Sequence, residues 1–191
     1  QYQAATHDNG PLLILAGAGS GKTRTITHRI AWLVRERAVH PSSILAVTFT
    51  NKAAGEMRDR VRGLLEGGGT PAWMGTFHSV CLRLLRINAA RLGYPSDFVV
   101  YDDDDSERLM KLVLDDMSIP RDQVRRFTSF ADRLKNDGFI DAPEPASNYE
   151  AVAADAFRRY QRALVKAGAM DFGDLLVQAL RLIDENPDVR E

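Results

Sequence analysis

The chain has 191 residues, of which 45% are hydrophobic and 27% are charged, and its 25 Lys and Arg nearly balance its 26 Asp and Glu. This composition is typical of a folded globular protein and excludes collagen-like, mucin-like and disordered chains. The only cysteine, Cys81, excludes a disulfide framework within the chain and favours a reducing, cytoplasmic setting. The net charge of −1 excludes a uniformly basic nucleic-acid coat, although it permits a basic face.

The apolar runs of the sequence are short. The longest, residues 12–16, is far below the roughly 20 residues that a membrane-spanning helix needs. No basic segment followed by an apolar one opens the chain, so we expect neither secretion nor a membrane partner. Because the chain begins with Gln1 rather than Met, we expect it to be trimmed or to be a fragment.

The first part of the chain, up to about residue 92, alternates short apolar segments with amphipathic ones. The apolar segments 12–15, 44–48 and 73–76 are predicted strands. Helices are predicted at 22–37, at 52–65 and after residue 76. Apolar strands that alternate with helices indicate a parallel sheet covered on both faces, and therefore an α/β domain.

The second part, from about 93 to 168, is predicted to be mostly helical, and a further helix begins near Asp171. Apolar residues spaced three or four apart mark the buried faces of these helices. They are Leu109, Leu112, Val113 and Met117 in one helix and Phe157, Tyr160 and Leu164 in another.

The strongest motif is residues 16–23, Ala-Gly-Ala-Gly-Ser-Gly-Lys-Thr, between a predicted strand and a predicted helix. Glycines let backbone N–H groups surround phosphate oxygens, and the start of the helix adds its positive dipole end. We expect Lys22 to contact the β- and γ-phosphates and the Thr23 hydroxyl to ligate Mg²⁺, which makes them the predicted catalytic pair. The generic motif has Gly where Ala16 stands. The loop predicts nucleotide binding without distinguishing a kinase, a GTPase and a motor.

A second group of polar residues follows the strand predicted at 44–48. Phe49 could stack a base of single-stranded nucleic acid, while Thr48, Thr50, Asn51 and Lys52 could hold its phosphates. In the alternative interpretation Phe49 belongs to the core, and Thr50 or Asn51 caps the next helix. Taken alone, this segment favours the alternative.

With these residues in view, the chain resembles the UvrD/Rep/PcrA family of superfamily 1 DNA helicases. The family's phosphate loop stands unaltered at 16–23, where Ala16 is its usual residue, and its Thr-Phe-Thr-Asn-Lys-Ala-Ala motif stands unaltered at 48–54. Gly-Thr-Phe-His at 75–78 matches the next motif, and residues 100–102 and 170–172 resemble further ones. The resemblance covers the whole chain.

This resemblance implies a RecA-like P-loop NTPase domain with a parallel sheet that carries an inserted all-helical subdomain. The motor domain would comprise 1–92 and 169–191, and the insertion 93–168. The implied activity is ATP hydrolysis coupled to 3′–5′ movement on single-stranded DNA and unwinding, in repair or replication. Single-stranded DNA, junctions of single and double strands, and further helicase domains absent from this chain are the implied partners. Helicase-nucleases share these motifs.

The family pattern also assigns roles to single residues. Gln1 would read the adenine edge, and Arg24 would lie beside the nucleotide. Thr76 would line the DNA track, or else cap a helix, and His78 would line it or be a satisfied surface histidine. The implied ATP-binding residues are Gln1, Ala16, Gly17, Ala18, Gly19, Ser20, Gly21, Lys22, Thr23 and Arg24. The implied DNA-binding residues are Thr48, Phe49, Thr50, Asn51, Lys52, Thr76, Phe77 and His78.

Two acidic pairs in the chain resemble the family's acidic box, Asp-Glu-x-Gln-Asp. We expect the box itself to lie beyond Glu191. Both 115–116 and 184–185 follow apolar residues, but each is predicted to lie on a helix. In the acidic run 102–105 we expect Asp104 and Glu107 to form a capping box rather than a metal site. Two alternative functions remain open. One is a small-molecule kinase that uses 115–116 as its acidic pair, and the other is a nucleotide- and DNA-binding module that does not hydrolyse ATP.

We therefore expect the 191-residue chain by itself to bind nucleotide weakly and scarcely to hydrolyse it. Loss of an arginine that stabilises the transferred phosphate lowers rates about 10³–10⁵-fold, and a missing acidic box adds to that loss. Single-turnover hydrolysis of labelled ATP, with Lys22→Ala as the contamination control, measures this. Turnover near ~1 s⁻¹ that the control abolishes would contradict the expectation.

Overall fold

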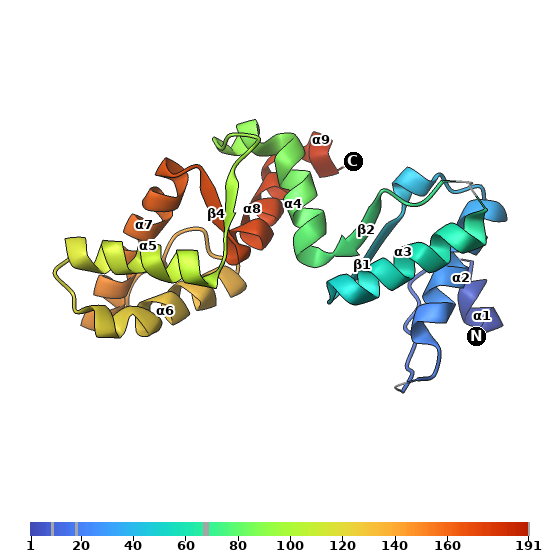
Figure 1. Ribbon diagram of the computed structural model, residues 1–191, viewed down its shortest axis with the longest axis horizontal. Coiled ribbons are helices and arrows are strands. Elements are labelled where there is room, and N and C mark those ends of the chain that lie inside the picture. Colours follow the sequence, from blue (N-terminus) through green and yellow to red (C-terminus); the bar gives the residue numbers. More distant parts are fainter. Residues whose placement is uncertain (9, 18, 67–68, 191) are drawn as a thin grey trace. The chain divides into compact units, whose positions relative to one another are not determined.

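The computed structural model describes residues 1–8, 10–17, 19–66 and 69–190, and the chain divides into two compact units, Gln1–Val80 and Cys81–Glu191. The first unit contains two parallel strands and the helices around them (Figure 1). Its elements are α1 (Tyr2–Ala5), α2 (Lys22–Arg35), the 3-10 helix η1 (Pro41–Ser43), β1 (Leu45–Thr48), α3 (Asn51–Leu65), β2 (Trp73–Thr76) and the start of α4 (Phe77–Asn88).

The sheet of the first unit consists of β1 and β2, which pair in parallel with Thr48 opposite Thr76. The intervening helix α3 packs against both strands and against α2, and Figure 1 shows it beside the strand pair. Buried residues of α3 recur at helical spacing and so form one apolar face. The core of the unit consists of Ile30, Ala31, Ile44, Ala46, Met57, Val61, Leu65 and Met74.

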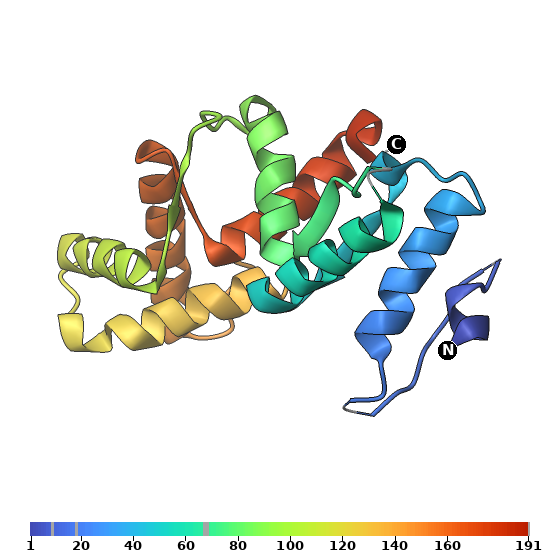
Figure 2. The same ribbon diagram turned by 45° about the vertical axis from the view of Figure 1, so that its right-hand side comes forward.

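The strand predicted at 12–15 is not formed. Both ribbon views draw the segment between α1 and α2 as coil (Figure 1, Figure 2), and Leu13 and Leu15 are 82% and 86% exposed. A strand needs a neighbour for its backbone hydrogen bonds. Among the described residues β1 and β2 pair only with each other. The prediction was wrong because an apolar run reports the tendency to form a strand but not the presence of a partner.

The second unit contains a second parallel pair, β3 with β4, surrounded by helices. The segment 93–168 is mostly helical, as the apolar spacing predicts, but the all-helical subdomain that the resemblance implies is wrong because β3 lies within it. Three residues are too few to show a period-2 pattern, and β3 forms by pairing with a strand about 70 residues away. The elements are η2 (Ala89–Leu92), β3 (Val99–Tyr101), α5 (Asp103–Asp116), η3 (Arg121–Gln123), α6 (Val124–Asn136), α7 (Asn148–Lys166), β4 (Ala169–Asp171), α8 (Phe172–Glu185) and α9 (Pro187–Arg190).

Two apolar clusters stabilise the second unit. One fills the space among α5, α6 and α7, which Figure 1 shows grouped together, and it contains Met110, Leu114, Phe127 and Phe157. The predicted face of α5 is partly wrong, because Leu112 is 63% exposed. The other cluster joins α4, β4 and α8 and contains Leu85, Phe98, Met170, Leu175 and Leu182.

The start of α5 differs from the prediction. Asp102 is the N-cap, and its side chain accepts a hydrogen bond from the backbone N–H of Asp105 at 2.9 Å. Glu107 instead pairs with Lys111 at 2.6 Å. An N-cap needs extended backbone, which Asp102 has because it directly follows β3, whereas Asp104 already lies within the helix. The predicted capping box of Asp104 and Glu107 is therefore wrong.

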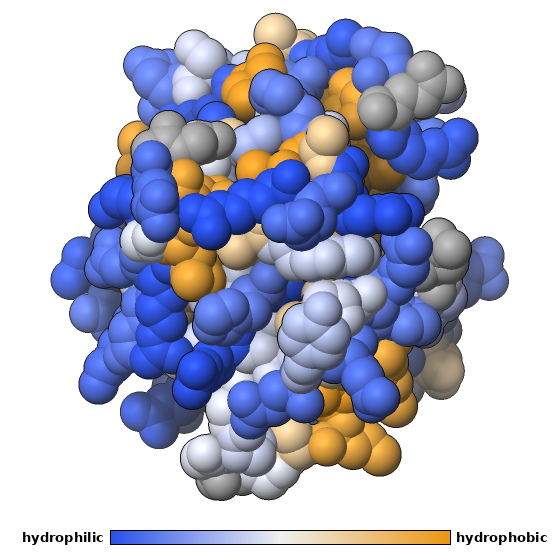
Figure 3. All heavy atoms as spheres, turned by 90° about the vertical axis from the view of Figure 1, so that its right-hand side faces the viewer, coloured by the Kyte–Doolittle hydropathy of each residue, from blue (hydrophilic) through white to orange (hydrophobic). Residues whose placement is uncertain are grey.

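The face of the protein drawn in Figure 3 is mainly hydrophilic. On the face that Figure 3 shows, apolar residues form several separate patches among hydrophilic ones. Within the described part of the chain, no helix is long and apolar enough to cross a membrane.

A buried ion network joins α6, α7 and the start of α8. Lys135, with its side chain 1% exposed, contacts Asp171 at 2.5 Å and Asp174 at 2.8 Å. Asp171 and Asp174 form a capping box, Tyr160 donates to Asp171 at 2.9 Å, and Gln161 donates to Asp174 at 3.0 Å. Burial raises the pKa of the Asp174 carboxyl, and the Lys135 ammonium opposes that rise. One cation thus compensates two buried carboxylates.

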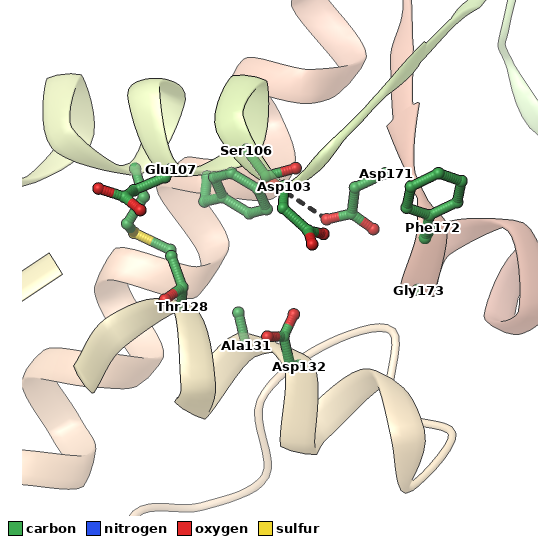
Figure 4. Close-up of a pocket in the computed structure, with 11 residues that line it drawn as sticks. Asp103, Ser106, Glu107, Thr128, Ala131, Asp132, Asp171, Phe172 and Gly173 are labelled. Atoms are coloured by element: carbon green, nitrogen blue, oxygen red, sulfur yellow. Dashed lines mark hydrogen bonds between the residues drawn. The ribbon is translucent and has the colours of Figure 1, made fainter. Parts of the chain in front are cut away.

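One side of this network opens into a cavity of about 160 Å³ between α5, α6 and the start of α8. Figure 4 shows the carboxylates of Asp103, Asp132 and Asp171 facing this space, with the hydrogen bond to Asp171 drawn as a dashed line. Burial raises the pKa of Asp132, and the negative charge of Asp171 adds to this effect. Nowhere in the described residues do three or more His, Cys, Asp or Glu form a group that could hold a metal ion.

We expect Lys135→Met to destabilise the protein by about 3–5 kcal/mol, because it leaves two buried carboxylates without their cation. Lys111→Met, which breaks the half-buried surface pair with Glu107, should cost about 0–1 kcal/mol. Chemical denaturation followed by circular dichroism measures both free energies of unfolding. Equal, small losses in the two variants would show that the network does not hold the unit together.

Candidate functional site

The loop at 16–23 leads directly into α2, whose first residue is Lys22. Gly21 is the N-cap and has a φ of 87°, a left-handed conformation that favours glycine. The Lys22 ammonium donates hydrogen bonds to the carbonyl oxygens of Ala16 at 2.8 Å and Gly17 at 2.9 Å. Lys22 is therefore folded back over its own loop. The predicted residue Ala18 lies outside the described residues.

The loop and the start of α2 present an electropositive, accessible surface. The first turn of α2 contains no acidic residue, and Lys22, Thr23 and Arg24 are exposed. The first N–H groups of a helix lack partners within it, and the helix dipole places positive charge at that end. The surface is thus chemically suited to an anion with several oxygens, such as a polyphosphate.

Gln1 lies against the phosphate loop. Its side-chain amide donates a hydrogen bond to the carbonyl oxygen of Ser20 at 2.9 Å. A Cβ atom on Gly21 would lie 2.9 Å from this amide nitrogen, so a larger residue there would displace the Gln1 side chain. A cavity of about 180 Å³ beside it is lined by Gln1, Tyr2, Ala5, Arg24, Thr25 and His28. The structure therefore brings the predicted Gln1 and Arg24 together next to the loop.

The second group of predicted residues lies at the carboxyl ends of β1 and β2. Phe49 follows β1 and is 90% exposed, so the interpretation that placed it in the core is wrong. Phe77 follows β2 and is 46% exposed. Their ring centroids are 5.9 Å apart, with the planes tilted by 47°. The parallel pairing thus places two accessible aromatic rings side by side.

Two of the predicted hydroxyl residues cap helices. Thr50 accepts a hydrogen bond from the N–H of Ala53 at the start of α3, at 3.2 Å. Thr76 accepts one from the N–H of Ser79 in the first turn of α4, also at 3.2 Å. The capping alternatives for Thr50 and Thr76 are therefore confirmed. An exposed Thr50 remains accessible to a ligand, whereas Thr76 is buried.

The remaining predicted residues of this group surround the rings. Asn51 and Lys52 in the first turn of α3 and His78 in the first turn of α4 are exposed, and Thr48 at the end of β1 is half-buried. Their side chains offer amide, ammonium and imidazole groups close in sequence to Phe49 and Phe77. This arrangement can stack flat rings and bind negative charge on one surface.

Sequence reasoning missed two residues that shape this edge of the sheet. A Cβ atom on Gly75 would lie 2.3 Å from the Ser79 hydroxyl, so no other residue fits there without a shift. Arg58 of α3 donates to the carbonyl oxygen of Met74 in β2 at 2.8 Å and so ties the helix to the strand. The motif at 75–78 contains Gly75 and could have pointed to it. No pattern in the sequence pointed to Arg58.

The acidic pairs that imitate the family's acidic box lie on helices, as predicted. Asp115 and Asp116 end α5, where they pair with Arg121 and Arg159 respectively. Hydrogen bonding to Arg121 lowers the pKa of Asp115. The pair at 184–185 ends α8. Neither pair follows a strand, which removes the acidic pair of the kinase alternative. Cys81 is half-buried on α4, and burial raises the pKa of its thiol.

Comparison with known proteins agrees with this geometry. The family model of the UvrD/REP helicase N-terminal domain matches residues 1–191. The chain is 42% identical over 196 residues to the ATP-dependent DNA helicase PcrA of Staphylococcus aureus strain Mu50, and 41% identical over 198 residues to that of Staphylococcus epidermidis strain RP62A. Each match covers 100% of this chain and 27% of the relative's length. The chain thus belongs to the UvrD/REP helicase family, in which it matches the N-terminal domain.

Proposed function

We propose that this chain is the N-terminal motor region of an ATP-dependent DNA helicase that couples ATP hydrolysis to 3′–5′ movement on single-stranded DNA. The observation that carries the proposal is the presence, in one compact unit, of a cationic phosphate loop and an exposed aromatic pair at a sheet edge. The two relatives are ATP-dependent DNA helicases, which supports the proposal. We also propose that the helicase unwinds duplex DNA in repair or replication.

The nucleotide site would be formed by the residues of and around the phosphate loop. Lys22 now donates to two loop carbonyls, so the space that it covers would accept phosphate oxygens when its ammonium turns towards them. The Thr23 hydroxyl, in the first turn of α2, would ligate Mg²⁺. When bound, Mg²⁺ neutralises negative charge on the β- and γ-phosphates. Gln1 and Arg24 would contact the base and the sugar from the adjoining cavity.

The DNA site would be formed at the carboxyl ends of β1 and β2. Phe49 and Phe77 would stack bases, because exposed rings bind every base through its π face. Asn51, Lys52 and His78 would hold the phosphates of the strand. Thr48 and Thr50 would complete this surface, Thr50 while still capping α3, and the buried Thr76 would support it by capping α4. Contacts of this kind bind single strands without reading their sequence.

The domain organisation that we propose is a RecA-like motor domain comprising 1–92 and 169–191, with an insertion at 93–168. The parallel pair β1–β2 and the helices of the first unit support the motor assignment. The parent protein would supply the remaining helicase domains and would act at junctions of single and double strands. We also propose that the parent protein acts in the cytoplasm.

The first test concerns Lys22. In the parent protein Lys22→Ala should lower ATP turnover at least about 10²-fold, because it removes a fixed charge aimed at the transferred phosphate. Melting temperature should not change, since Lys22 is exposed. Lys111→Ala, which removes a half-buried lysine of α5 outside the phosphate loop, is the control and should retain full turnover. Wild-type turnover in purified Lys22→Ala protein would refute the nucleotide site.

The second test concerns Phe49. Phe49→Ala should weaken binding of single-stranded DNA by about 1–3 kcal/mol, the contribution of one base stacked on an aromatic ring. Its melting temperature should stay at the wild-type value, because the ring is 90% exposed. Phe49→Trp should restore binding, and Leu112→Ala, at another exposed apolar residue, should not affect it. Fluorescence anisotropy with a labelled oligonucleotide measures the affinities, and unchanged affinity in Phe49→Ala would refute the stacking role.

A further inference from the structure

A cavity of about 380 Å³ lies entirely within the second unit, between α7 and α8. Residues from α7, α8 and the segment around 92–94 form its walls. This volume falls within the range of small-molecule sites, which is about 300–1,000 Å³. None of the residues that line it belongs to the phosphate loop or to the edge of the sheet at β1 and β2.

The rim of the cavity is cationic. Arg162 and Lys166 stand one turn apart on α7, both are exposed, and neither has an acidic partner among the described residues. Arg181 of α8 pairs through Nε with Glu185 at 2.9 Å, which leaves its terminal nitrogens for other contacts. No acidic residue lines the cavity. The rim is therefore complementary to a negatively charged group such as a phosphate.

The interior of the cavity is mainly apolar and partly aromatic. Leu92, Val165 and the ring of Tyr94 line it. Tyr94 is buried, and burial raises the pKa of its phenol to about 12, so it stays protonated and neutral at physiological pH. A flat, neutral ring system would bury its faces favourably against these side chains.

Gln178 lines the cavity and carries a buried, unpaired side-chain oxygen. This residue of α8 is only 5% exposed, and its side-chain oxygen has no hydrogen-bond partner among the described residues. A buried acceptor without a partner is unfavourable and rare in folded proteins. The last torsion of a glutamine is broad, so the amide can present an acceptor and a donor to a molecule in the cavity. The neighbouring Gln161 is held by its hydrogen bond to Asp174.

We propose that this cavity binds a nucleotide, with the base inside against the apolar walls and the phosphate at the rim. Gln178 would pair with the edge of the base, and adenine or cytosine is favoured over thymine because each offers an amino donor beside a ring acceptor. Arg162 and Lys166 would hold the phosphate. The inference deepens the proposed function, because the nucleotide is either a unit of a bound DNA strand or a free nucleotide, at a site separate from both sites of the first unit.

The test uses the 191-residue chain with Lys22→Ala and Phe49→Ala, which disable the two sites of the first unit. Two probes are titrated: deoxyadenosine monophosphate by calorimetry, and a short labelled oligodeoxyadenylate by fluorescence anisotropy. Arg162→Ala together with Lys166→Ala should lower affinity about tenfold or more, because two charge-assisted contacts are lost. The matched control, Arg108→Ala with Arg125→Ala, removes two exposed cations that do not line the cavity and should have no effect.

The outcomes are distinct. Weaker binding of both probes supports a site for free nucleotide and strand alike, whereas weaker binding of the oligonucleotide alone assigns the site to a unit of a strand. An equal loss in the control, or no binding of either probe, overturns the inference. If Phe49→Ala by itself leaves oligonucleotide binding intact while the cavity variants weaken it, the proposed DNA site of the first unit fails and the cavity stands.

A second variant separates binding from structure. Gln178→Leu removes the unpaired acceptor with little change in volume, so its melting temperature should equal or exceed that of the wild type. Its affinity for deoxyadenylate should fall while its affinity for thymidylate changes less. A loss of melting temperature with unchanged affinity for both would show that Gln178 only packs, and would overturn its role in the cavity.

Discussion

The parallel pairing of β1 with β2 is the constraint on which the proposed DNA site depends. It places Thr48 opposite Thr76, so the chain leaves both strands at the same edge of the sheet. The residues that follow, Phe49 and Phe77, are thereby held 5.9 Å apart even though 28 positions separate them in sequence. Thr50 and Thr76 cap the helices that begin beside the rings, and both rings stay accessible. Rigid strands thus fix a surface that loops alone could not hold.

The phosphate loop is positioned by different means. Its conformation depends on left-handed backbone at Gly21, on the hydrogen bonds of Lys22 to loop carbonyls and on the contact of Gln1 with Ser20. A ligand can replace the hydrogen bonds of Lys22, because phosphate oxygens are better acceptors for an ammonium than neutral carbonyl oxygens are. The two proposed sites of the first unit therefore combine one rigid surface with one that is ready to reorganise.

The second unit is built around a buried charge network, and that network also borders the further cavity. Lys135 holds Asp171 and Asp174 at the start of α8, and Asp174 accepts a hydrogen bond from Gln161. Gln161 in turn lines the cavity beside Gln178. Because buried ions tolerate little displacement, the helices that form the cavity walls are held in a fixed register. Binding there would need no large rearrangement.

The local features of this protein could be predicted from its amino-acid sequence alone: the loop at 16–23, helices α2, α3, α7 and α8, strands β1 and β2, and the helical character of Asp115, Asp116 and Asp184. Each rests on residues close together in the chain, through glycine conformation, capping and apolar spacing. The tertiary structure decided the rest, because strand pairing and burial depend on distant partners. The apolar run at 12–15 found no strand to pair with, whereas Val99–Tyr101 found β4. Phe49 became exposed, Asp102 rather than Asp104 capped α5, and Gln178 was left buried without a partner.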